Sequence, residues 1–144
     1  MNKKEKAIKN FETLNCNQSV LAAFGPGFGV DEKLCLKLGL GFGGGMARQG
    51  KTCGVVTGAY LVIGLWSAEQ SKDKTEIKKI AYDKIEEFNQ RFTAIHENTE
   101  CKSLLKYDMS IPEEAQKIEM LGLTEKICPI LVGSSAEILE DILT

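Results

Sequence analysis

Cysteines are the side chains of this sequence best suited to chemistry. They lie at five well-separated positions: Cys16, Cys35, Cys53, Cys101 and Cys128. No two form a C-x-x-C pair, so the signatures of zinc ribbons, thioredoxins and covalent haem attachment are absent. In a reducing compartment, scattered cysteines indicate metal or redox chemistry rather than structural disulfides. The one histidine, His96, cannot support a multi-histidine metal site and is expected to be a solvated residue at a helix end.

Four of the five cysteines coincide with predicted helix N-termini. Each follows a capping residue closely or precedes a proline of a first helical turn: Asn15 before Cys16, Thr52 before Cys53, Thr99 before Cys101, and Pro129 after Cys128. Unpaired N–H groups and the helix dipole stabilise an anion there and lower the pKa of a thiol. The thiolate is the form that attacks disulfides or binds metal. Cys35 lies among leucines instead and is predicted to be a small core residue.

A second motif overlaps the cysteine pattern. The stretch GMARQGKT, residues 45–52, fits the phosphate-loop pattern G-x-x-x-x-G-K-[ST]. A working phosphate loop needs a preceding strand and a second apolar strand that ends in an acidic residue. Residues 34–42 alternate and could form that strand or a helix, but no aspartate closes an apolar strand. The sequence therefore predicts that ATP and GTP do not bind, and the short G-x-G-x-x-G at residues 39–44 fails for the same reason.

Apolar periodicity predicts helices along most of the chain. Residues 3–23 could form one helix or two helices separated near Asn15, and the clearest amphipathic helix covers residues 71–95. Further helices are expected over 53–66, from Thr99, from Pro112 to about Gly122, and from Pro129. The small residues of 53–66 allow close packing, either in a core or in the seam of a homodimer. We therefore expect an all-α protein: a single compact domain over residues 1–144 with five to seven helices and a Gly-rich loop.

Composition restricts the partners. Of the 144 residues, 43% are apolar and 26% charged, which is typical of a globular chain that can bury a core without disulfides. A net charge of -2 argues against nucleic acid. No apolar run is long enough to cross a membrane, and the first 15 residues lack the apolar region of a secretory signal. The expected location is the cytoplasm.

Five segments, in order along nearly the whole chain, resemble a known family. They are 15-NCNQSV-20, 42-FGGGM-46, 53-CGVVTG-58, 101-CKSLL-105 and 128-CPILVGSSAEIL-139. Together they are similar to the C_GCAxxG_C_C family of small proteins with a redox role. The resemblance carries the four family cysteines over to Cys16, Cys53, Cys101 and Cys128, and it leaves Cys35 outside the pattern. Val55 stands where the family motif has alanine, and this difference leaves the cysteine of the motif unaffected.

Three functions remain open at this stage. The four cysteines could exchange electrons with a redox partner protein by thiol/disulfide chemistry, with no cofactor. Their thiolates could instead bind an iron–sulfur cluster or zinc. The third alternative is a non-catalytic helical interaction module. In either of the first two cases we expect Cys16, Cys53, Cys101 and Cys128 to form one site. At least two of them, Cys53 included, should lie within disulfide reach of each other.

Overall fold

The computed structural model describes residues 1–144 and contains eight α-helices, two short 3-10 helices and no β-strand. In chain order the elements are α1 (Lys3–Asn10), α2 (Cys16–Phe24), η1 (Gly25–Phe28), α3 (Glu32–Gly39), η2 (Leu40–Phe42), α4 (Gly54–Ala68), α5 (Lys74–His96), α6 (Cys101–Leu105), α7 (Pro112–Met120) and α8 (Leu123–Ile142). The predicted all-α class is confirmed. No helix is both long and apolar enough to span a bilayer.

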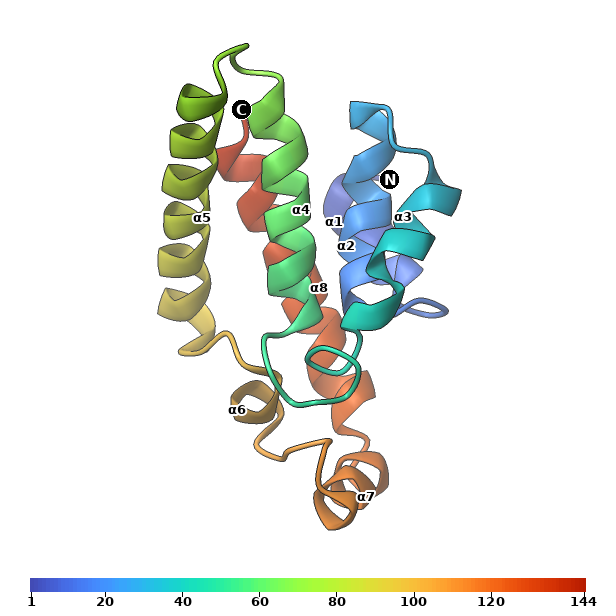
Figure 1. Cartoon of the computed structure of the whole chain (residues 1–144). Coiled ribbons are helices and arrows are strands. Elements are labelled where there is room, and N and C mark those ends of the chain that lie inside the picture. Colours follow the sequence, from blue (N-terminus) through green and yellow to red (C-terminus); the bar gives the residue numbers. More distant parts are fainter.

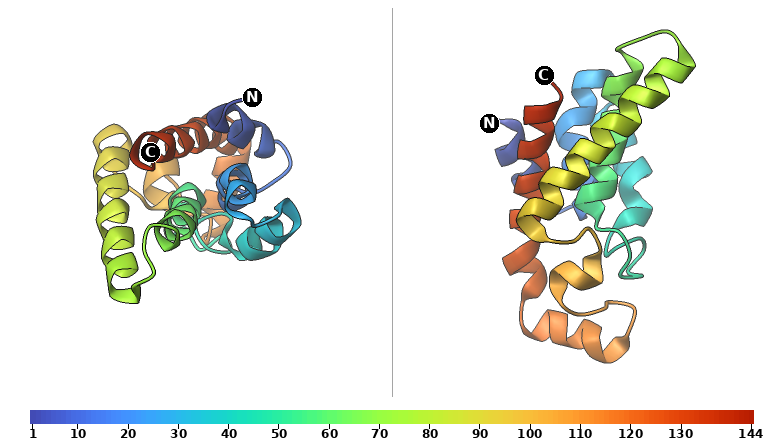
Figure 2. Two further views of the ribbon diagram at one scale, coloured as in Figure 1. Left: turned by 90° about the horizontal axis from the view of Figure 1, so that it is seen from above. Right: turned by 90° about the vertical axis from the view of Figure 1, so that its left-hand side faces the viewer.

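The longer helices form a bundle around α4, which packs against α2, α5 and α8 (Figure 1). Helix α8 runs along the bundle and contacts α1 at one end and the short helices α6 and α7 at the other. A loop of residues 43–53 joins η2 to α4 and lies beside α6 (Figures 1 and 2). This end of the bundle therefore collects the starts of α2, α4 and α6 in one region.

The predicted number of five to seven helices is too low by at least one. Each of the two segments whose structure the sequence left open contributes to two helices. Residues 3–23 form two helices, since Asn15 caps α2 with a reciprocal pair of hydrogen bonds to Gln18. Residues 34–42 form α3 and η2, since the Asp31 carboxylate caps α3 through the backbone N–H of Leu34. The strand that a phosphate loop would need before residue 45 is thus a helix.

Helix α8 begins six residues earlier than the sequence predicts, so the placement of Cys128 at a helix N-terminus is wrong. The helix starts after Gly122, whose φ of 62° suits glycine, and Cys128 lies in its second turn. Pro129 lacks an N–H and leaves one backbone bond of that turn unmade. The turn persists because Leu123 and Ile127 pack against the apolar cluster around Cys101 and Cys128.

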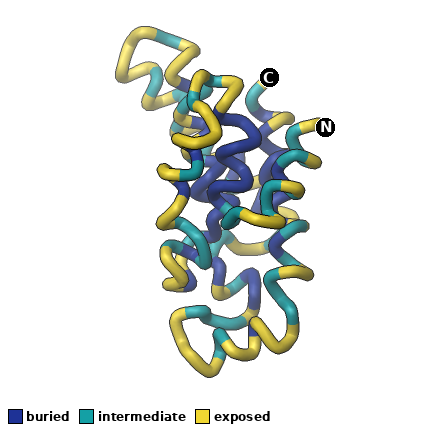
Figure 3. Tube along the Cα trace, turned by 90° about the vertical axis from the view of Figure 1, so that its right-hand side faces the viewer, coloured by how far each residue is buried: buried dark blue, intermediate teal, exposed yellow.

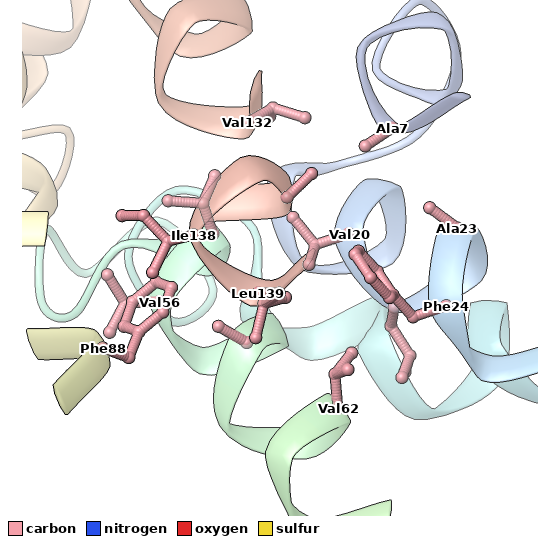
Figure 4. Packing of buried hydrophobic residues seen from close by; sticks show 14 of the residues in the cluster. Ala7, Val20, Ala23, Phe24, Val56, Val62, Phe88, Val132, Ile138 and Leu139 are labelled. Atoms are coloured by element: carbon pink, nitrogen blue, oxygen red, sulfur yellow. The ribbon is translucent and has the colours of Figure 1, made fainter. Parts of the chain in front are cut away.

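The main core lies between α2, α4, α5 and α8 (Figure 4). Phe88 and Phe92 of α5 are fully buried and stacked, with ring centroids 5.7 Å apart. Buried backbone runs through the middle of the molecule, whereas exposed residues follow the outer helix faces and the turns (Figure 3). A smaller apolar cluster of Cys101, Leu105, Ile118 and Cys128 joins α6, α7 and α8. Two of the family cysteines thus belong to this second cluster.

Small residues on α4 let the backbone of α2 approach it closely, as the sequence predicts. A methyl group on Gly58 would lie 3.0 Å from the carbonyl oxygen of Asn17. Between the two helices the buried Asn17 amide donates a 3.0 Å hydrogen bond to the Thr57 hydroxyl. Gly64 differs, because nothing lies within 4 Å of its Cβ position. The close approach is therefore confined to the first half of α4, next to Cys53.

Candidate functional site

One cavity of about 440 Å³ is lined by all four cysteines that the sequence singles out: Cys16, Cys53, Cys101 and Cys128. Cys53, Cys101 and Cys128 are only 4%, 6% and 5% exposed, and Cys16 is half-buried. Each comes from a different helix or helix end, so the bundle brings distant parts of the sequence to one place. The remaining walls are mostly apolar side chains and the glycines of the 43–53 loop.

Cys16 is the first residue of α2 and is held by the capping of that helix. The Asn15 side chain accepts a 2.8 Å hydrogen bond from the Gln18 N–H and donates one of 3.0 Å to the Gly39 carbonyl. The cap therefore ties the start of α2 to the end of α3. Glycine at position 54 lets α4 approach, because a methyl group there would lie 2.8 Å from the Cys16 Cβ atom. Cys16 is consequently packed directly against the start of α4.

Cys53 and Cys101 are positioned by a short antiparallel pairing of their segments. Thr52 and Glu100 form an isolated β-bridge. The Cys53 N–H donates to the Thr99 carbonyl at 2.8 Å, and the Cys101 N–H donates to the Lys51 carbonyl at 2.6 Å. These bonds fix the cap residue of α4 beside the first residue of α6. The pairing joins two cysteines that are tens of residues apart in sequence.

Cys16 shares the cavity with Cys53 and Cys128. Hydrogen bonding to Cys128 and Cys53, together with burial, raises the pKa of Cys16 well above its ordinary value. The same Cys16 hydrogen bond lowers the pKa of Cys53, against the effect of burial. Cys53 makes no side-chain capping hydrogen bond, yet the N–H groups of Val55 and Val56 at the start of α4 also lower its pKa. Cys53 is therefore the thiol best prepared to ionise, and Cys16 is the proton-bearing neighbour.

Cys101 is also a weakly acidic thiol. Burial, then the proximity of Cys53, Cys128 and Asp108, raises the pKa of Cys101 to about 12, while the charge of Arg48 opposes this shift. The prediction that the helix dipole lowers the pKa of Cys101 is therefore wrong. Helix α6 has only five residues, too short to outweigh burial next to other thiols. Cys101 stays a neutral thiol at neutral pH.

The loop that closes the cavity has an unusual backbone. Residues 44–48 all have φ between 52° and 68°, and three of them, Met46, Ala47 and Arg48, are not glycine. Each non-glycine residue in this left-handed conformation costs roughly 1–2 kcal/mol. The turn is fixed by the bond from the Arg48 N–H to the Gly43 carbonyl at 2.9 Å. Ala47 and Arg48 line the cavity, a placement that the resemblance of this loop to a phosphate loop did not reveal.

The comparisons with known proteins give one match. The family model described as "Putative redox-active protein (C_GCAxxG_C_C)" matches residues 14–142. The chain belongs to the C_GCAxxG_C_C family. The resemblance in sequence is thereby confirmed. The chain has no match among curated proteins or among solved structures.

The segment 53-CGVVTG-58, which corresponds to the C_GCAxxG_C_C motif, has a clear physical role in this fold. Cys53 supplies a thiol of the cavity, and both glycines face the backbone of α2. Val55, where the motif has alanine, is fully buried in the core and does not line the cavity. The motif thus supplies both a thiol of the cavity and the glycines that allow close contact between α2 and α4.

Cys35 and His96 lie away from the cavity. Cys35 is fully buried in α3, and its Sγ atom lies 3.5 Å from the Val30 carbonyl oxygen and 3.7 Å from that of Leu21. His96 ends α5, where its Nε2 atom lies 2.9 Å from the Ser134 hydroxyl, and burial lowers its pKa. The expected helix-end position of His96 is confirmed, but the ring is half-buried rather than solvated.

The four cysteines share the cavity without forming a preassembled metal site. No group of three or more His, Cys, Asp or Glu side chains in the chain is arranged to hold a metal ion. All five cysteines are free thiols. What the arrangement offers directly is two thiols with oppositely shifted pKa values in one cavity, with two further thiols in the same cavity.

Proposed function

We propose that the protein is a thiol/disulfide redox protein in which Cys53 is the nucleophile and Cys16 the resolving thiol. The observation that carries the proposal is that both cysteines line one cavity, where Cys16 packs directly against the start of α4 next to Cys53. Hydrogen bonding between the two lowers the pKa of Cys53 and raises that of Cys16. A nucleophile of lowered pKa next to a protonated neighbour is the arrangement used for thiol–disulfide exchange. Membership of the C_GCAxxG_C_C family supports the same chemistry.

The exchange proceeds in two steps. The Cys53 thiolate attacks one sulfur of a substrate disulfide, forms a mixed disulfide and expels the other half as a thiolate. The Cys16 thiol then gives its proton to that thiolate and attacks the Cys53 sulfur. This forms the Cys16–Cys53 disulfide and releases the second half of the substrate, which takes up a proton from solvent as a thiol. Two electrons pass from the cysteine pair to the substrate, and the reverse sequence oxidises a dithiol.

Cys128 and Cys101 have supporting roles in this proposal. Because the Cys16 thiol also contacts that of Cys128, an oxidised Cys16 can exchange its partner within the cavity. Cys101, with a pKa of about 12, remains protonated and does not compete as a nucleophile. The four family cysteines are thus proposed to act as one site with Cys53 at its reactive end.

A redox titration tests the proposal. The protein would be equilibrated in dithiothreitol buffers of graded oxidation, then acid-quenched, and its free thiols counted by alkylation and mass spectrometry. We expect two thiols to disappear together and reversibly, and Cys53→Ala or Cys16→Ala to abolish the transition. Cys35→Ala is the matched control and should leave it unchanged. A loss of single thiols without a paired transition would contradict the proposal.

Metal binding by the same thiols is the alternative outcome. Four thiols on one cavity are the ligand type of an iron–sulfur cluster or a zinc site. Protein purified without oxygen would be measured by absorbance and metal analysis. Stoichiometric iron with cluster absorbance, or stoichiometric zinc, that is lost in Cys16→Ala and Cys53→Ala would replace the dithiol proposal with the metal one. Colourless protein without bound metal would favour the dithiol proposal.

A further inference from the structure

We infer that the substrate of the Cys53–Cys16 pair is a low-molecular-weight disulfide with an apolar body and an anionic group, and that Arg48 recognises this group. The inference rests on the proposed function and names the substrate class for that site. It is built from three features of the cavity: the depth of the thiols, the apolar walls and the single charge.

The depth of the thiols favours a small substrate. The sulfur-bearing residues Cys53, Cys101 and Cys128 are at most 6% exposed, so their sulfurs are reached through the cavity rather than from the protein surface. A disulfide on the surface of a folded protein cannot approach such sulfurs unless a segment of that protein enters the cavity. A volume of about 440 Å³ lies in the range of small-molecule pockets, roughly 300–1,000 Å³.

The walls of the cavity favour an apolar body. Phe11 and Leu14, between α1 and α2, form part of the wall, and Met109 and Leu131 form another part. Apolar walls of this kind gain free energy by covering aromatic or aliphatic groups, whereas a strongly hydrated ligand would lose its water there. Asn15 and Thr124 add a few polar atoms, as is usual in ligand pockets.

Arg48 is the one charged side chain that lines the cavity. It is exposed, and its guanidinium makes no salt bridge and no hydrogen bond with the rest of the chain. The left-handed turn of residues 44–48 holds it in place, since a methyl group on Gly44 would already lie 2.9 Å from the Arg48 Cα atom. Its charge reaches the thiols, because it lowers the pKa of Cys101. An unpaired guanidinium at an apolar cavity is suited to bind a carboxylate through two parallel hydrogen bonds.

The atoms and electrons balance as in the proposed exchange. The anionic group stays bound to Arg48 while the Cys53 thiolate bonds to one substrate sulfur and the substrate S–S bond breaks. Closure of the Cys16–Cys53 disulfide then releases the bound half. The substrate disulfide gains two electrons and ends as two thiols, and the cysteine pair loses two electrons.

Two aromatic disulfide probes test the inference, and each is compared with itself between the wild type and the variants. One is 5,5′-dithiobis(2-nitrobenzoate), which carries carboxylates, and the other is 4,4′-dithiodipyridine, which is neutral at pH 7. Stopped-flow absorbance gives the rate constant of the first exchange, and peptide mapping identifies the disulfide formed. We expect Arg48→Gln to slow the anionic probe about three- to tenfold and to change the neutral probe less than twofold. Arg48→Lys should retain most of the rate with the anionic probe.

Lys72→Gln is the matched control. It removes the same charge from an exposed lysine before α5 that does not line the cavity, and it should leave both rates unchanged. If Arg48→Gln does not fold, the salt dependence of the two rates in the wild type tests the inference instead. Added salt should slow the anionic probe and leave the neutral one unchanged, because it screens an attraction.

The outcomes separate the two proposals. If the Cys16–Cys53 disulfide forms and Arg48→Gln slows neither probe relative to the wild type, the substrate inference alone is overturned. The substrate inference is also overturned if added salt speeds the reaction of the anionic probe, since the net interaction between probe and protein would then be repulsive. If neither probe produces a Cys16–Cys53 disulfide, the proposed function fails, and the inference fails with it.

Discussion

The Cβ position of Gly54 faces the side chain of Cys16, and a methyl group added there would lie 2.8 Å from the Cys16 Cβ atom and 2.7 Å from the Asn17 nitrogen. Glycine is therefore required for the contact between α2 and α4 at the point where Cys16 meets Cys53. The closeness of these two thiols depends on a residue that bears no side chain.

Gly54→Ala should accordingly destabilise the fold and separate the two thiols. Overpacking of this kind costs about 1–3 kcal/mol, and urea unfolding would measure it. Formation of the Cys16–Cys53 disulfide should slow in the same variant. Gly64→Ala is the matched control on the same helix, because its Cβ position is open. That substitution should raise stability by roughly 0.5–1 kcal/mol. Equal effects of the two substitutions would contradict the packing argument.

The pH dependence of Cys53 alkylation should depend on Cys16. The Cys16 hydrogen bond lowers the pKa of Cys53, so Cys16→Ala should raise that pKa and move the rate profile with iodoacetamide to higher pH. Cys16→Ser keeps a hydroxyl donor and should move the profile less. Mass spectrometry of the Cys53 peptide across pH would give the profiles. An unchanged midpoint in Cys16→Ala would show that the two thiols do not interact.

The alkaline stability of the protein should depend on Cys101. Its folded-state pKa is raised to about 12 from 9.0, so the folded state holds the proton more tightly than the unfolded state does. The resulting stabilisation is fully present below pH 9 and is lost as the pH rises toward 12. The stability advantage of wild type over Cys101→Ala should therefore shrink between pH 8 and pH 10.5, as measured by urea unfolding at each pH. An advantage that is constant or grows would contradict the assignment.

Cys35 should be structural. Its side chain is fully buried outside the cavity, so Cys35→Ala should cost about 1 kcal/mol through a small void and lower Tm by a few degrees. Calorimetry would measure this loss. Disulfide exchange by the other cysteines should continue at the wild-type rate. A loss of exchange in this variant, in which the fold is retained, would place Cys35 in the site.

Much of this fold could be predicted from local signals in the sequence. Asn15 and Asp31 mark helix starts by their capping chemistry, and the apolar stripe of residues 77–92 defines α5. The start of α8 could not be predicted in the same way. Pro129 indicates a first turn by local preference, but the packing of Leu123 and Ile127 against a distant cluster extends the helix beyond it. At the start of α8, tertiary contacts therefore outweigh the local preference of the sequence.

The site was predictable as a set of residues and not as an arrangement. The motifs pointed to four cysteines, although the capping argument failed for Cys128, and the structure brings all four to one cavity. The pairing of Thr52 with Glu100, which places Cys53 beside Cys101, is not encoded by any local pattern. Arg48 could not be found at all, because positive φ at a non-glycine residue carries no signal in the sequence.

Peptide mapping after limited oxidation would show whether Cys53 and Cys16 form a reactive pair. Reduced protein would be treated with less than one equivalent of oxidant per molecule, alkylated in acid, digested without reduction and mapped by mass spectrometry. The first intramolecular disulfide should join the Cys16 peptide to the Cys53 peptide. A first disulfide that excludes Cys53, or one that involves Cys35, would contradict it.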